Sequence, residues 1–71
     1  MTTIEMKILR DRVRWLNKAI TEVLKMIDTL EDLELDTTTM EETFTKLTDE
    51  RMEIIKTLAA AGALRKVLAM Q

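Results

Sequence analysis

The 71-residue chain contains no cysteine, histidine or proline, and these absences narrow its chemistry. Without cysteine, the chain can form neither a disulfide framework nor a thiolate metal site. Without histidine, it lacks the commonest transition-metal ligand and the usual general base of enzymes. No apolar run approaches the roughly 18–20 residues that a bilayer-spanning helix requires. We therefore expect no metal, cofactor, small-molecule substrate or membrane association, and no catalytic residues.

Aromatic residues and glycine are also scarce, since Trp15 and Phe44 are the only aromatic residues and Gly62 is the only glycine. Helix-breaking residues are thus nearly absent, whereas 46% of the residues are hydrophobic and 34% are charged, which favours a folded, strongly patterned chain. A chain of this length holds one domain, whose core supplies only about 3–5 kcal/mol. The N-terminal segment lacks the basic-then-apolar order of a secretion signal, which favours a cytoplasmic location.

Charge is distributed unevenly along the chain, despite a formal net charge of −2. Residues 1–25 carry six basic against three acidic side chains, and residues 26–53 carry two basic against ten acidic ones. Residues 54–71 add three basic side chains and no acidic one. The acidic stretch lacks the glycine turn of a calcium-binding EF-hand loop. Folded as a hairpin, the chain would bring its two basic ends together, opposite an acidic bend.

The first half of the chain has the periodicity of an amphipathic helix. Apolar residues recur at alternating steps of three and four, a heptad pattern with two apolar positions per repeat. Thr2 and Glu5 have the spacing of a capping box at the start of this helix. The pattern fails at Glu34, so we predict a helix over about residues 3–34. The apolar positions a and d are Met6, Leu9, Val13, Leu16, Ile20, Val23, Ile27 and Leu30.

A short bend, at about residues 35–38, connects this helix to a second one. Asp36 could cap the second helix and complete a hydrophobic staple, or Thr38 could cap it and pair with Glu41 in a capping box. Either start leaves a short connection, and short connections produce antiparallel neighbours. We therefore predict an all-α antiparallel helical hairpin.

The second helix, predicted over about residues 39–61, is less regular than the first. Arg51 interrupts its apolar rhythm, and we expect this side chain to reach the edge of the hairpin or to pair with Asp28 or Glu31. The residues that keep the rhythm are Phe44, Leu47, Ile54, Leu58 and Ala61.

Gly62 leaves two alternatives for the C-terminal segment. It could end the second helix and leave a kink or a short third helix at about residues 63–70. It could instead sit inside one long helix, at a cost of about 1 kcal/mol relative to alanine, where another backbone comes close.

A second apolar stripe lies beside the heptad on each helix. It comprises Ile8, Trp15, Ala19 and Met26 at c and g positions of the first helix, and Met52, Ile55 and Ala59 on the second. A hairpin buries only one narrow stripe per helix, and each large side chain left exposed forgoes roughly 1.5–3 kcal/mol. We therefore predict a homodimer that resembles a four-helix bundle. The predicted core and dimer residues are Leu9, Val13, Leu16, Ile20, Val23, Ile27, Leu30, Phe44, Leu47, Ile54, Ile55 and Leu58.

Basic residues around Trp15 are the candidate binding site. Tryptophan and arginine are enriched in binding hot spots, and basic side chains near a helix N-terminus oppose the helix dipole. The candidate residues are Ile8, Arg10, Arg12, Arg14, Trp15 and Lys18. We hypothesise a non-enzymatic module that binds and regulates or sequesters a larger, unidentified protein, in the manner of a phage- or plasmid-encoded regulator or inhibitor. The alternatives are nucleic-acid binding, which a sequence pI near 5.1 disfavours, and a structural or assembly role.

One short segment resembles an enzyme family. Leu9-Arg10, Val13, Leu16-Asn17 and Ile20 resemble the first-helix pattern of AroQ-type chorismate mutases, in which an arginine of that helix binds a substrate carboxylate. The chain departs from this pattern at Arg14, where the family usually has aspartate, and at Ile27, where it has arginine. We therefore do not expect enzymatic activity.

Overall fold

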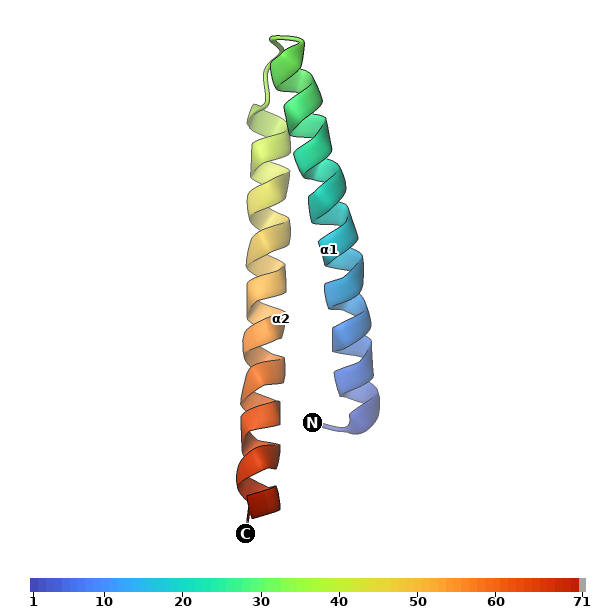
Figure 1. Cartoon of the computed structure of the whole chain (residues 1–71), viewed down its shortest axis with the longest axis vertical. Helices are drawn as coiled ribbons and strands as arrows, with labels where there is room; N and C mark the ends of the chain where they lie inside the picture. The colour runs from blue at the N-terminus through green and yellow to red at the C-terminus, as the bar shows by residue number, and fades with distance from the viewer. Residues whose placement is uncertain (71) are drawn as a thin grey trace.

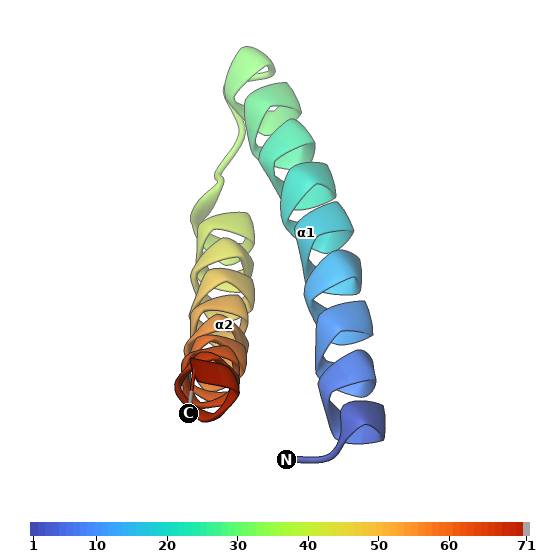
Figure 2. The ribbon, with the colours of Figure 1, turned by 60° about the horizontal axis from the view of Figure 1, so that its bottom comes forward.

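The chain folds as two antiparallel helices. A computed structural model describes the backbone of residues 1–70 and the side chains of residues 1–62. Helix α1 (Thr3–Asp32) packs along helix α2 (Thr38–Met70) in a rod that measures 58 × 17 × 14 Å. Both chain ends lie away from the bend (Figures 1 and 2). The predicted all-α helical hairpin is therefore confirmed.

Helix α1 begins with the cap that the sequence indicates. The Thr2 backbone is extended, and its hydroxyl accepts a hydrogen bond from the Glu5 amide at 3.1 Å. The same hydroxyl donates to the Glu5 carboxylate at 3.2 Å. Thr2 therefore supplies one of the acceptors that the first free amides of a helix require.

Helix α1 ends at Asp32, slightly before the predicted boundary near residue 34. Glu34 adopts a left-handed conformation with φ of 57°, and the Leu35 amide donates to the Leu30 carbonyl at 2.8 Å. This bond, which spans five residues, is characteristic of the Schellman motif that closes a helix. Because Glu34 stands where the next apolar a residue would be, the helix ends where its core-facing pattern stops.

Helix α2 begins at Thr38, so Thr37 holds the N-cap position, and its carbonyl accepts a hydrogen bond from the Glu41 amide at 2.9 Å. Asp36 lies one residue before this cap. Its carboxylate accepts hydrogen bonds from the Thr38 amide at 3.0 Å and from the Thr38 hydroxyl at 2.6 Å. Both bonds lower the pKa of Asp36 below its ordinary value, and the bond from the Thr38 hydroxyl has the larger effect. Glu41 accepts a bond from the Thr37 hydroxyl at 2.8 Å and makes none to Thr38 within the described residues. The N-cap position is therefore held by Thr37 rather than by either predicted residue, although Asp36 does satisfy the first amide of the helix.

The small hydrophobic core comes from α1. Its buried side chains are Met6, Leu16, Ile20 and Val23, and Leu16 is fully enclosed. The remaining a and d residues of α1 are half-buried. None of the α2 side chains that the structure describes is buried, and Phe44, Leu47, Ile54, Leu58 and Ala61 are half-buried. The heptad seam of α1 thus faces α2, as its periodicity predicts.

Gly62 lies within α2, and its φ is not positive. A Cβ placed on Gly62 would meet no atom within 4 Å, so among residues 1–62 nothing from α1 approaches it closely. The predicted third helix concerns residues 63–70, whose side chains lie outside the described part of the chain, and it stays a prediction.

Candidate functional site

The hairpin separates charge along its length. The basic N-terminal part of α1 lies at the open end, and the acidic bend lies at the other (Figure 1). Four acidic side chains are exposed there, namely Glu31, Asp32, Glu34 and Asp36. Among the described residues, no group of three or more acidic side chains is close enough together to hold a metal ion. The candidate sites are therefore surfaces along the rod.

Two opposite faces flank the seam between the helices. In heptad order, Arg12 at g and Trp15 at c lie beyond the d edge of α1, whereas Arg10 at e and Arg14 at b lie beyond its a edge. We call the first surface the Trp15 face, which comprises Ile8, Arg12, Trp15, Ala19, Glu22 and Met26. We call the second the Ile55 face, because one hollow is lined by Arg10, Val13, Arg14, Ile55, Leu58 and Ala59.

The Trp15 face carries large apolar side chains that the hairpin does not cover. Ile8 is 62% exposed, Trp15 is 52% exposed and Met26 is 51% exposed. The guanidinium carbon of Arg12 lies 4.4 Å from the centroid of the Trp15 ring, a cation–π contact. Arg12 therefore stacks on one face of the indole ring, and about half of the Trp15 surface remains exposed to solvent.

Arg12 also connects the two helices along this face. Its Nε and Nη2 donate to the two carboxylate oxygens of Glu50, at 2.6 and 3.1 Å. The hydrogen bond from Arg12 lowers the pKa of Glu50, and the same bond raises the pKa of Arg12. Exposed ion pairs stabilise proteins only slightly. The main consequence of the two bonds to Glu50 is therefore that they fix the guanidinium of Arg12 against the Trp15 ring.

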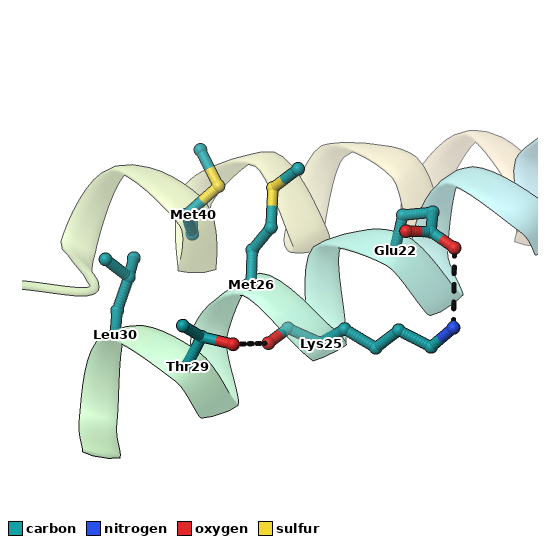
Figure 3. A pocket seen from close by; sticks show the side chains of 6 residues that line it. All are labelled: Glu22, Lys25, Met26, Thr29, Leu30 and Met40. Atoms are coloured by element: carbon teal, nitrogen blue, oxygen red, sulfur yellow. Dashed lines mark hydrogen bonds and ion pairs between the residues drawn. The ribbon is translucent and has the colours of Figure 1, made fainter. Parts of the chain in front are cut away.

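A shallow hollow lies between the helices at the bend end of the Trp15 face. It has a volume of about 340 Å³, and Met26, Leu30 and Met40 form its apolar part (Figure 3). At its rim, Glu22 and Lys25 pair at 3.5 Å. The apolar surface thus continues from Trp15 towards the bend.

The Ile55 face combines arginines with an apolar floor. The hollow there has a volume of about 450 Å³. Arg10 and Arg14 lie on its α1 side, and Ile55, which is 43% exposed, belongs to its floor. The Arg14 side chain is 81% exposed, and its contact with Asp11, at 3.8 Å, is long. Such a surface suits a ligand that has both apolar and acidic groups.

Arg51 is placed differently from the sequence expectation. Its Nη1 donates to the side-chain oxygen of Asn17 at 3.0 Å, so the predicted pairing with Asp28 or Glu31 is wrong. In the antiparallel arrangement, residue 51 lies beside residue 17, whereas the acidic residues near the bend lie opposite the first turns of α2. The bond to Asn17 is a second polar link between the helices, on the Ile55 side of the seam.

The structure divides the predicted binding residues between the two faces. Ile8, Arg12 and Trp15 share the Trp15 face. Arg10 and Arg14 lie on the Ile55 face, and Lys18 is exposed at an f position on the outer side of α1. Their heptad positions already separate Arg10 from Arg12. The part played by Glu50 carried no such signal, because it depends on how α2 aligns with α1.

Comparison with protein-family models, curated proteins and solved structures finds no match to this chain. Within the described residues, neither helix combines the length and the hydropathy that crossing a membrane requires. The two faces are therefore the features of the molecule that bear on its function.

Proposed function

We propose that this chain is a non-enzymatic protein-interaction module, a homodimeric helical hairpin that binds and regulates or sequesters a larger protein. The observation that carries the proposal is the apolar surface left open on two opposite faces of a hairpin that buries only four of the side chains described, those of residues 1–62. Large apolar side chains exposed in contiguous patches are typical of protein–protein interfaces. One face is available to a second copy of the chain, and the other to a different protein.

The Ile55 face is the proposed site for the larger protein. Arg10 and Arg14 flank an apolar floor, so the complementary surface is a segment that presents acidic side chains beside apolar ones. An amphipathic helix with an acidic edge has this composition, and helices commonly bind by laying their apolar side into a groove. The basic residues would then set the orientation, and Ile55 would supply apolar contact.

Substitution of Arg14 tests this proposal. Proteins captured by the tagged wild-type chain should be lost with Arg14→Glu, and the affinity of a purified partner should fall at least about tenfold, or about 1.4 kcal/mol. Lys56→Glu is the matched control, because Lys56 is also an exposed cation in a pair three residues apart, with Glu53 at 3.7 Å. Equal capture by all three chains, each with unchanged helicity by circular dichroism, would contradict the site.

The nucleic-acid alternative is decided with the same three proteins. Labelled duplex and single-stranded DNA and RNA are titrated at low and at physiological salt. Phosphate contacts would give an affinity that falls steeply with salt and that is lost with Arg14→Glu. We expect no such binding, since Arg10, Arg14 and Lys18 belong to a chain with net negative charge.

A further inference from the structure

The c and g positions of α1 form a stripe whose complementary residues lie at equal distances on either side of the level of Asn17 along the helix axis. Ile8 and Met26 each lie nine residues from Asn17. Trp15 and Ala19 each lie two residues from it. A two-fold interface uses the same patch on both subunits, so a helix that meets its own copy in antiparallel orientation needs this kind of symmetry.

The charged residues of the stripe follow the same symmetry. Arg12 and Glu22 each lie five residues from Asn17, on opposite sides of it. An antiparallel copy centred on Asn17 would therefore place Arg12 opposite Glu22, and the two-fold axis would create this pair twice. The longer-range charges agree, since the basic start of each α1 would lie beside the acidic end of the other.

Side-chain size also matches across this centre. Trp15, which is 52% exposed, would lie against Ala19 of the second copy, so the largest side chain meets the smallest in the stripe. Ile8 and Met26, both more than half exposed, would cover each other. Arg12 uses Nε and Nη2 for Glu50, and within the described residues its Nη1 has no hydrogen bond. That nitrogen is available to Glu22 of the second copy.

Neighbouring alignments lose these matches. A shift by one heptad in one direction pairs Glu5 with Glu22, which brings two negative charges together. The same shift pairs Arg12 with Trp15, so Arg12 loses its acidic partner. The opposite shift pairs Trp15 with Met26, but it places Ala19 against Glu22 and leaves Arg12 opposite Thr29, without an acidic partner. The alignment centred on Asn17 is the one in which apolar, small-to-large and charged partners all agree.

We propose that a second copy of this chain docks on the Trp15 face, with α1 against α1 in antiparallel orientation and the two-fold axis at the level of Asn17 along the helix. The inference rests on the proposed homodimer and specifies its geometry. Each Ile55 face then points away from the dimer contact and stays open for another protein. Trp15 belongs to the contact between copies, and Arg14 belongs to the surface for the larger protein.

Cysteine cross-linking tests the geometry, because the full chain has no cysteine of its own. Ile8→Cys and Met26→Cys variants are each oxidised alone and as an equimolar mixture. The mixture should cross-link through residues 8 and 26, whereas each variant alone should not. In an antiparallel pair centred on Asn17, equal positions lie 18 residues apart along the helices, or about 27 Å, far beyond disulfide reach.

A second pair protects the test against folding defects. Glu5 and Thr29 are exposed and each lie twelve residues from Asn17, so Glu5→Cys mixed with Thr29→Cys should also cross-link. Helicity by circular dichroism and mass by light scattering are measured for every variant. Cross-linking of Ile8→Cys with itself, in a protein that scatters as a dimer, would overturn the antiparallel geometry and leave the proposed dimer intact. A monomer at every concentration would overturn both.

Discussion

The two helices of this hairpin differ in how they use their apolar residues. All four buried side chains of the described chain belong to α1, which also carries the exposed stripe around Trp15. The described part of α2 has no buried residue, and its apolar side chains are half-buried or exposed. The difference indicates that α1 is the central helix of the proposed dimer, with α2 on one side and a second copy on another. Helix α2 braces α1 and contributes Ile55 to the partner surface.

The largest expected effect is at the centre of α1. Leu16 is completely buried, so Leu16→Ala should lower the free energy of unfolding by about 2–5 kcal/mol. Leu58 is half-buried on α2, and Leu58→Ala should cost less. Urea unfolding followed by circular dichroism measures both. Equal losses would show that the two helices contribute equally to the core, and would contradict the conclusion that α1 supplies most of it.

The next effect compares the apolar stripe beside the heptad of α1 with the corresponding stripe on α2. Trp15→Ala should weaken dimerisation by about 30-fold, which corresponds to the roughly 2 kcal/mol of an interface hot spot. Ile55→Ala should change the dimer dissociation constant by less than about threefold, because its face points away from the proposed contact. Sedimentation equilibrium measures both constants. The reverse ranking would place the second copy on the Ile55 face.

A smaller effect concerns α2 alone. Gly62→Ala should stabilise the hairpin by about 1 kcal/mol, or raise Tm by about 4–8 °C, because the added Cβ meets no atom within 4 Å. Ala60→Gly, at an exposed position of the same helix, should have the opposite effect. A lower Tm for Gly62→Ala would reveal a close backbone contact at Gly62 that only the assembled protein contains.

The smallest effect tests the link between the helices on the Trp15 face. The pKa of Glu50 lies below its ordinary value of 4.5 because Arg12 donates to the carboxylate, so the folded state favours the ionised form. The stabilisation is therefore fully present above pH 4.5 and is lost as the pH falls through the lowered pKa. Carboxyl NMR titration should show the pKa of Glu50 returning to its ordinary range in Arg12→Gln. An unchanged pKa in that variant would mean that Arg12 does not contact Glu50 in solution.

Much of the fold follows from local sequence. The heptad from Met6 to Leu30 predicts both α1 and the side of it that is buried, because a helix fixes the angle of each side chain around its own axis. The cap at Thr2 and the bond from the Thr38 amide to Asp36 were also predictable, since each bond spans three residues or fewer. The N-cap of α2 was not, because Thr37 holds that position. The end of α1 was predicted less accurately, near residue 34 rather than at Asp32. The chain leaves the helix through a left-handed conformation at Glu34, and this conformation is uncommon for glutamate.

The candidate site was harder to predict than the helices. In the sequence-based prediction, Arg10, Arg12 and Arg14 belong to one candidate binding site, whereas the hairpin places Arg12 on one face and the other two on the opposite face. Helical periodicity separates them in principle, but only the position of α2 shows what each one meets. The pairing of Arg51 failed for the same reason, since it required the alignment of two helices.

The sequence by itself determined an amphipathic first helix, a less regular second helix, a short bend, a buried seam on α1 and more apolar surface than one hairpin covers. These are consequences of spacing along one chain, where each residue is fixed relative to its near neighbours. Only the tertiary structure decided that Arg12 reaches Glu50, that Arg51 reaches Asn17, and that Ile55 joins Arg10 and Arg14. Those contacts depend on the axial alignment of α2 with α1 and on which edges of the two helices face each other. The geometry of the bend sets both.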